Sequence, residues 1–172
     1  VASAFKQGLE DTGVHFVLGT TVAKISKAEN NSYVVTLANG QSFIADAVLS
    51  AIGLQPNTAL AKATNIATAR GVLTNSSLET NQADIFAVGD CAEVNGTLLP
   101  FVMPIMQQAR ALAKTLNGVQ TTVHYPAMPV AVKTPAAPLT VLAVPNDLEV
   151  TWQTEELDDG MIARAFDSSE TL

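Results

Sequence analysis

Cysteine is nearly absent from this 172-residue sequence: Cys91 is the only one, which excludes an internal disulfide or a Cys-x-x-Cys redox pair. Basic residues are also few, at 9 Lys and Arg against 16 Asp and Glu, and the formal net charge is −7. That balance argues against nucleic acid or an anionic membrane surface as a partner. No apolar run approaches the roughly 20 residues of a membrane span, and no signal peptide is recognisable. We therefore expect a cytoplasmic protein.

Glycine occurs 10 times but never at two positions that are two apart, so the sequence contains no Gly-x-Gly-x-x-Gly loop. Such a loop cradles the pyrophosphate of a bound dinucleotide on backbone N–H groups. No phosphate cradle of this kind is therefore expected within the chain. Hydrophobic residues make up 48% of the sequence and charged residues 15%, a composition typical of proteins that fold around an apolar core.

Metal-ligating patterns are also lacking. His15 and His124 are far apart, and neither has Cys or Asp at ligand spacing. The carboxylates of Asp84, Asp90 and Glu93 are a conceivable divalent-metal site, but spacings of 6 and 3 do not place them on one helix face. We expect no metal site.

The first part of the chain predicts an α-helix followed by short strands. Apolar residues recur at helical spacing through residues 1–12, and Gly13 suits the end of that helix. Asn39-Gly40 lies between two alternating runs and is a strong signal for a two-residue hairpin. The expected strands are Val14–Leu18, Thr21–Ile25, Tyr33–Leu37, Gln41–Ala45 and, as a buried strand, Ala47–Ile52.

The middle of the chain mixes short elements with one long helix. The short elements are a helix at Thr58–Thr64, a strand at Gly71–Thr74, a buried strand at Ile85–Val88 and a loop at Cys91–Phe101. From Pro104 to Leu116 the apolar residues form a stripe of helical period, and proline suits a first helical turn. Asn117-Gly118 predicts the end of this helix.

Beyond Gly118 the pattern becomes β-rich, and we place a domain boundary near residues 118–124. Proline lacks the backbone donor that an interior helix needs. Five prolines punctuate this region: Pro126, Pro129, Pro135, Pro138 and Pro145. The β runs between them are Val130–Lys133, Leu139–Val144, Leu148–Trp152 and Met161–Phe166, and the acid run Glu155, Glu156, Asp158 and Asp159 predicts a solvated turn.

The stretch TNQADIFAVGDCAEV, Thr80–Val94, carries the most specific local pattern. A short apolar run ends at Gly89, and Asp90 follows at once, which predicts a carboxylate at the carboxyl edge of a sheet, where open α/β sheets bind ligands. A carboxylate only accepts hydrogen bonds, so it suits a ligand rich in hydroxyl groups. The alternative is an aspartate that caps a turn or helix.

Four stretches together resemble a known family. TNQADIFAVGD (Thr80–Asp90) resembles the second FAD-binding motif of the two-dinucleotide-domain flavoprotein reductases, and ADAVLSAIGLQPN (Ala45–Asn57) resembles their return from the NAD domain to the FAD domain. LPFVMPIMQQARALAKTLNG (Leu99–Gly118) and YPAMPVAVKTPAAPL (Tyr125–Leu139) are similar to bacterial rubredoxin–NAD reductases. The resemblance spans nearly the whole chain and is diffuse in residues 1–40 and 145–172.

The resemblance implies a fold and a division into domains. We expect an α/β chain with a partial two-dinucleotide-domain flavoprotein fold, followed by a small β-rich C-terminal domain. Residues 1–54 would be the tail of the NAD-binding domain, residues 55–118 the returning segment of the FAD-binding domain, and residues 119–172 the start of the C-terminal domain. Complete members carry two Gly-x-Gly-x-x-Gly loops, so we expect this chain to be the C-terminal portion of a reductase about twice as long.

The resemblance also implies three cofactor-binding residues and no catalytic side chain. Asp90 would bind the ribityl chain of FAD. The Val102 backbone N–H would reach the pyrimidine edge of the flavin, unless Val102 is a plain core residue. Lys133 would face the flavin and stabilise the anionic reduced ring, unless it is an edge-strand lysine that prevents aggregation. Cys91 is expected to be an ordinary small thiol.

The implied function is that of an NADH-dependent flavoprotein that passes electrons through FAD to rubredoxin or a similar small iron protein. A ferredoxin-type reductase or an NADH oxidase of the same superfamily is the near alternative. A different class of alternative is a truncated α/β module that binds or scaffolds without catalysis.

Overall fold

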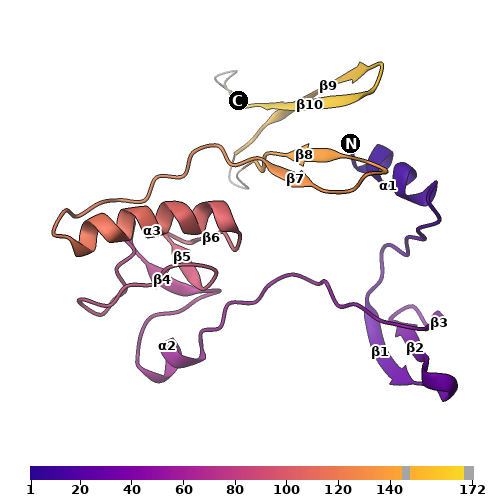
Figure 1. Ribbon diagram of the computed structural model, residues 1–172, viewed down its shortest axis with the longest axis horizontal. Coiled ribbons are helices and arrows are strands. Elements are labelled where there is room, and N and C mark those ends of the chain that lie inside the picture. The colour runs from indigo at the N-terminus through magenta and orange to yellow at the C-terminus, as the bar shows by residue number, and fades with distance from the viewer. Residues whose placement is uncertain (145–147, 169–172) are drawn as a thin grey trace. The chain divides into compact units, whose positions relative to one another are not determined.

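The computed structural model describes residues 1–144 and 148–168, and the chain divides into two compact units (Figure 1). Unit 1 comprises Val1–Ser50 and Pro129–Leu172, and unit 2 comprises Ala51–Met128. Pro145, one of the prolines expected to punctuate the β runs, lies outside the described residues, as does the end of the predicted domain 119–172.

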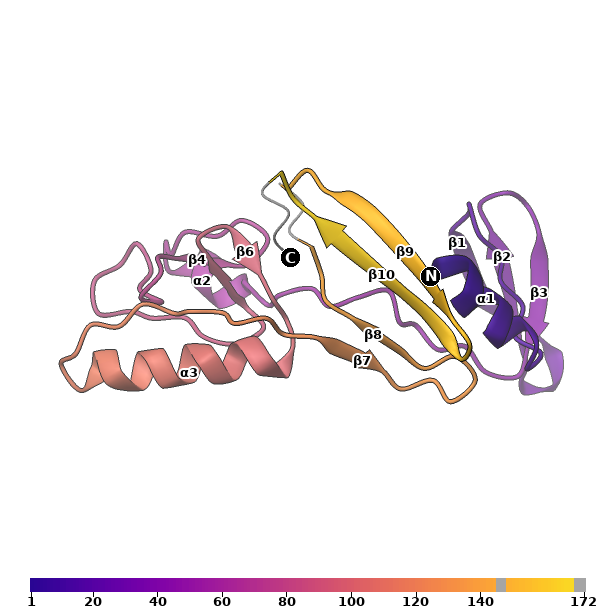
Figure 2. The ribbon, with the colours of Figure 1, turned by 90° about the horizontal axis from the view of Figure 1, so that it is seen from above.

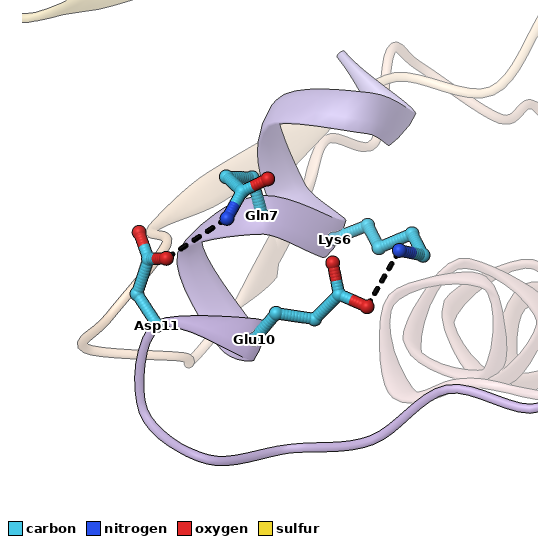
Figure 3. A network of polar contacts seen from close by, with 4 residues as sticks. All are labelled: Lys6, Gln7, Glu10 and Asp11. Atoms are coloured by element: carbon cyan, nitrogen blue, oxygen red, sulfur yellow. Dashed lines mark hydrogen bonds and ion pairs between the residues drawn. The ribbon is translucent and has the colours of Figure 1, made fainter.

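Unit 1 begins with helix α1, Ala2–Glu10, within the range expected from the apolar spacing. Two polar pairs, each four residues apart, lie along it (Figure 3). Lys6 Nζ lies 2.6 Å from Glu10 Oε1, and Gln7 Nε2 donates a hydrogen bond to Asp11 Oδ1 at 2.8 Å. Pairs at this spacing stabilise a helix by about 0.2–0.5 kcal/mol each, so they assist α1 without determining it.

An antiparallel sheet of order β1-β2-β3 follows, formed by Val22–Lys27, Tyr33–Leu37 and Ser42–Ala45. The hairpin predicted from Asn39-Gly40 joins β2 to β3, but its loop has three residues, 38–40, and not the expected two, because Thr36 pairs with Ser42. Gly40 has a φ of +88°, which a side chain would disfavour, and the Leu37 N–H donates to the Gln41 carbonyl at 2.8 Å. The three-stranded meander expected from the alternating pattern is therefore confirmed.

Two antiparallel hairpins form the C-terminal part of unit 1: β7 (Val130–Val132) with β8 (Leu139–Val141), and β9 (Thr151–Leu157) with β10 (Gly160–Phe166). Figure 2 shows β9 and β10 side by side along their length. Each of the four predicted β runs contains part of a strand.

The acid run is predicted as a turn, and that prediction is wrong for its first half. Glu155 and Glu156 lie within β9, and only Asp158 and Asp159 form the turn. Both faces of β9 are exposed, so a carboxylate on either face stays hydrated. Glu155 Oε2 also accepts a hydrogen bond from Arg164 Nη1 on β10 at 2.7 Å, a cross-strand pair of opposite charge that favours the longer strand.

Two predicted strands of the first fifty-two residues are wrong. Val14–Leu18 and Ala47–Ile52 have no strand structure, and the expected burial of the second is contradicted by Leu49 and Ile52, which are 90% and 95% exposed. A strand exists only when a neighbour accepts and donates its backbone hydrogen bonds. No such neighbour pairs with either run within residues 1–144 and 148–168.

Unit 2 contains a short helix, a small mixed sheet and a long helix. Helix α2 is Ala59–Ala63. Strand β4 (Val72–Thr74) runs parallel to β5 (Ala92–Val94), which pairs antiparallel with β6 (Thr97–Leu98). Helix α3 is Val102–Leu116 and ends at Asn117, as its apolar stripe and the Asn-Gly pair predict.

The buried strand predicted at Ile85–Val88 is wrong: the run forms no strand, and Ile85 and Val88 are 43% and 38% exposed. The strand of the Thr80–Val94 stretch is β5, so Asp90 precedes a strand and does not lie at the carboxyl end of one. Ile85–Val88 contributes a single β-bridge, between Phe86 and Glu79, whereas the predicted loop contains β5 and β6. Asn95 and Gly96 have φ of +47° and +77°, the pattern of a two-residue hairpin turn. The Asn-Gly signal that identified the first hairpin was therefore present here too, and the sequence reasoning missed it.

The core of unit 2 is small. Leu78, Ala92 and Val94 are 0%, 1% and 4% exposed and pack together. Ala87, Leu112 and Val123 pack against them, so a loop, helix α3 and the segment after α3 all cover β5. The Val123 N–H donates to the Ser76 carbonyl at 2.8 Å, which holds that segment along the core.

Gly71 permits the close approach of β4 and β5, and Gly71→Ala should destabilise unit 2. An added Cβ would lie 2.7 Å from the Cys91 carbonyl oxygen, which accepts the Val72 N–H at 2.7 Å. Separating the strands should cost about 1–3 kcal/mol, the usual range for overpacking. Urea unfolding measures the loss, with Gly160→Ala as control because no atom lies within 4 Å of its Cβ. Equal midpoints for the two variants would contradict this account.

Candidate functional site

The turn at Gly89 and Asp90 leads from the apolar run into β5. Gly89 has a φ of +92°, and a Cβ there would meet nothing within 4 Å, so glycine is required for its backbone conformation and not for space. The Ala92 N–H donates to the Gly89 carbonyl at 3.0 Å and closes the turn.

Asp90 lies on this turn as an exposed residue. Its carboxylate makes no hydrogen bond or ion pair within residues 1–144 and 148–168, so it caps no backbone N–H there. The capping alternative therefore finds no support in the described part of the chain. An unpaired carboxylate beside a glycine backbone fits a hydroxyl-rich chain such as the ribityl of FAD.

Gln108 makes a buried hydrogen bond to this turn. It lies in α3, is 1% exposed, and its Oε1 accepts the Gly89 N–H at 2.7 Å. Its Nε2 donates to Tyr125 Oη at 2.9 Å. The sequence reasoning missed this residue. The available signal was a polar residue on the buried face of an apolar helix, between Pro104 and Ala111.

Tyr125 lies in the segment that follows α3. Burial disfavours the charged phenolate and raises the pKa of Tyr125 above its ordinary value of 10.0, while the hydrogen bond from Gln108 acts in the opposite direction. The hydroxyl therefore remains protonated throughout the physiological range.

Val102 is the first residue of α3. Its N-cap, Phe101, makes no side-chain hydrogen bond, so the first N–H groups of the helix have no side-chain cap. The Val102 side chain is 72% exposed, which contradicts the alternative of a plain core valine. Val102 precedes Gln108 by six residues, or about 9 Å along the helix axis, so Asp90 and the start of α3 belong to one region of unit 2.

Lys133 belongs to unit 1, unlike Asp90 and Val102. It is exposed and directly follows β7, and the next N–H, of Thr134, donates back to the Val132 carbonyl at 2.9 Å. Its ammonium makes no ion pair within the described residues. Both interpretations, the flavin-facing lysine and the edge-strand lysine, are compatible with this position.

The carboxylates considered as a metal site, those of Asp84, Asp90 and Glu93, do not form a cluster in the described residues. Glu93 is 4% exposed, and its Oε2 accepts the Gly71 N–H at 2.7 Å, which ties β5 to the start of β4. In the part of the chain that the structure describes, no three His, Cys, Asp or Glu side chains gather as metal ligands. None of the helices in that part is long and apolar enough to cross a bilayer.

Two models of known protein families match this chain. The model of the pyridine nucleotide-disulphide oxidoreductase family matches residues 1–120, and that of the rubredoxin binding C-terminal domain matches residues 122–172. The chain belongs to the pyridine nucleotide-disulphide oxidoreductase family. The resemblance found in the sequence motifs is thereby confirmed.

The relatives in sequence are reductases of greater length. The chain is 68% identical, over 100% of its length, to a rubredoxin-NAD(+) reductase of Acinetobacter baylyi, covering 44% of that protein. It is 46% identical over 90% of its length to a rubredoxin-NAD(+) reductase of Alcanivorax borkumensis, covering 40%. A nitric oxide reductase FlRd-NAD(+) reductase of Salmonella agona is 42% identical, with 45% covered. The chain thus spans less than half the length of these relatives.

Solved structures agree on the fold. A ferredoxin reductase from Rhodopseudomonas palustris superposes with a TM-score of 0.83 at 22% identity, over 96% of this chain and 43% of that one. Putidaredoxin reductase, in a covalent complex with putidaredoxin, superposes with a TM-score of 0.71 at 25% identity, over 88% and 39%. The predicted fold class, a partial two-dinucleotide-domain flavoprotein followed by a small β-rich part, is confirmed.

The raised pKa of Tyr125 predicts that the protein loses stability at alkaline pH. Because its folded-state pKa is raised above 10.0, the folded state holds the phenolic proton to a higher pH than the unfolded state. The free energy of unfolding should be unaffected below about pH 10 and fall as the pH rises further. Urea unfolding of the chain between about pH 8 and about pH 11 measures this, and Tyr125→Phe should flatten the dependence. An unchanged slope in the variant would assign the alkaline loss to other groups.

Proposed function

We propose that this chain acts as part of an FAD-containing reductase that passes electrons from NADH through FAD to rubredoxin. The observation that carries the proposal is Asp90, an exposed carboxylate with no partner in the described residues, on a turn that is hydrogen-bonded to Gln108. The similarity to rubredoxin-NAD(+) reductases and the match of residues 122–172 to a rubredoxin binding domain support the choice of acceptor.

The predicted domains are part of this proposal. Residues 1–54 would complete the NAD-binding domain, residues 55–118 the FAD-binding domain, and residues 119–172 would begin the C-terminal domain. The family models, which cover residues 1–120 and 122–172, support the second boundary. The compact units change at 50/51 and 128/129, within about ten residues of both boundaries, but they group residues 1–50 with 129–172 in one unit and so support the boundaries without separating the first and third domains.

FAD, when bound, supplies the chemistry that couples a two-electron donor to a one-electron acceptor. The residues of this chain would bind and tune it. Asp90 would accept hydrogen bonds from ribityl hydroxyls. The uncapped N–H groups at Val102 would donate to the electron-rich edge of the ring, and the Lys133 ammonium would stabilise negative charge on the reduced ring.

The identity of the electron acceptor can be tested with the reductase that contains this chain. A purified yellow protein that absorbs near 450 nm (roughly, as flavins do) and oxidises NADH faster with rubredoxin than with a ferredoxin or with oxygen supports the proposal. A faster rate with ferredoxin or oxygen would favour the near alternatives. A colourless protein without NADH oxidation would favour the binding module.

Asp90→Ala in that reductase should weaken FAD binding. Removing the carboxylate removes charge-assisted hydrogen bonds worth about 1.5–3 kcal/mol, or roughly ten- to hundredfold in the dissociation constant. Flavin fluorescence on dilution measures it. Asp84→Asn is the control, because it removes a charge from the same stretch at a positive φ that Asn tolerates. Equal FAD affinity in the Asp90 and Asp84 variants would remove Asp90 from the site.

Lys133→Met should make the flavin harder to reduce while leaving the fold intact. Methionine preserves most of the apolar stem, so the main loss is the attraction of the ammonium for the reduced ring. A partly solvated pair of about 1–2 kcal/mol corresponds to a midpoint lowered by roughly 20–40 mV. A redox titration decides it, with Lys24→Met on β1 as a matched surface control. A Lys133→Met midpoint equal to that of the control would favour the edge-strand lysine.

A further inference from the structure

The carboxamide of Gln108 has a fixed chemical direction, because one end accepts hydrogen bonds and the other donates them. The Gly89 N–H is a donor, so it requires Oε1, which lies 2.7 Å away. Nε2 must then point to an acceptor, and Tyr125 Oη provides it at 2.9 Å. The Gly89 N–H therefore selects one of the two orientations of the side-chain amide, and the Tyr125 hydroxyl satisfies the amino end that this orientation turns toward it.

Because Gln108 is buried, a wrong orientation of its amide would destabilise the fold. Gln108 is 1% exposed and lies on the buried face of α3 with Pro104 and Ala111. Water cannot replace a lost partner there, and an unpaired buried polar group is costly. If the amide turned over, Nε2 would face the Gly89 N–H, and two donors would oppose each other.

The neighbouring Gln107 shows that the arrangement is specific to one position. Gln107 is on the same helix, is half-buried, and its side chain makes no hydrogen bond within the described residues. Gln107 has the same side chain as Gln108 but lacks its hydrogen bonds, so it serves as a matched control.

We propose that Gln108 is a positioning residue for the candidate flavin site: with its Nε2 paired to the Tyr125 hydroxyl, its Oε1 fixes the Gly89 N–H and so the turn that presents Asp90. The link to FAD rests on the function proposed above. The link to the turn rests only on the contacts of Gln108, Gly89 and Tyr125.

The test uses the reductase that contains this chain, without and with FAD. Amide hydrogen exchange at Gly89 reports the turn, and the FAD dissociation constant reports the site. Gln108→Met, which preserves volume, and Tyr125→Phe should each accelerate Gly89 exchange about tenfold and weaken FAD about three- to tenfold. Gln107→Met should leave both quantities unchanged.

Gln108→Glu separates positioning from packing. A glutamate keeps an oxygen toward the Gly89 N–H, and its other oxygen can accept from the Tyr125 hydroxyl or, when protonated, donate to it. It should therefore keep Gly89 exchange closer to the wild-type rate than Gln108→Met does. Tyr125→Phe removes one oxygen only, so it tests the hydrogen bond to Gln108 Nε2 even if Gln108→Met does not fold.

The outcomes distinguish the two proposals. Unchanged Gly89 exchange in both Gln108→Met and Tyr125→Phe would overturn the positioning role. A wild-type reductase that holds no FAD would overturn the proposed function and the link to FAD, while the exchange measurement in the apoprotein would still decide the role of Gln108 in the turn.

Discussion

Helix α3, the turn before β5 and the segment after α3 are joined in unit 2 by one buried side-chain amide. Gln108 joins helix α3 to the turn before β5 on one side and to the segment after α3 on the other. The apolar core beside it is small, with Leu78, Ala92 and Val94 as its buried centre. Where so little apolar surface is buried, a satisfied polar network contributes much of the geometric definition. Asp90 directly follows Gly89, whose N–H donates one of these two hydrogen bonds.

The second constraint is the need of every strand for a neighbour. Runs that pair with a run close in sequence form strands: β2 with β3 and β9 with β10. The apolar runs at Val14–Leu18 and Ala47–Ile52 lack hydrogen-bonded partners in the described residues and form no strand. Their composition is that of buried parallel strands, but composition alone forms no strand without a hydrogen-bonded neighbour.

The three predicted cofactor-binding residues do not all belong to one unit. Asp90 and Val102 belong to unit 2, whereas Lys133 belongs to unit 1. Tyr125 lies only four residues before unit 1 resumes at Pro129, so the segment that pairs with Gln108 Nε2 is also the one that leads to the C-terminal strands.

The sequence by itself determined the local elements and the family. Helical spacing identified α1 and α3, Asn39-Gly40 identified a hairpin, and the Gly89–Asp90 motif indicated a flavoprotein, because each of these signals resides in residues close along the chain. Tertiary structure alone decided the partner of Gln108 and the unpaired state of the Ala47–Ile52 run. Those outcomes depend on which donors, acceptors and strands from distant positions come into contact in the fold. The spacing of residues along the sequence does not show which distant groups will meet.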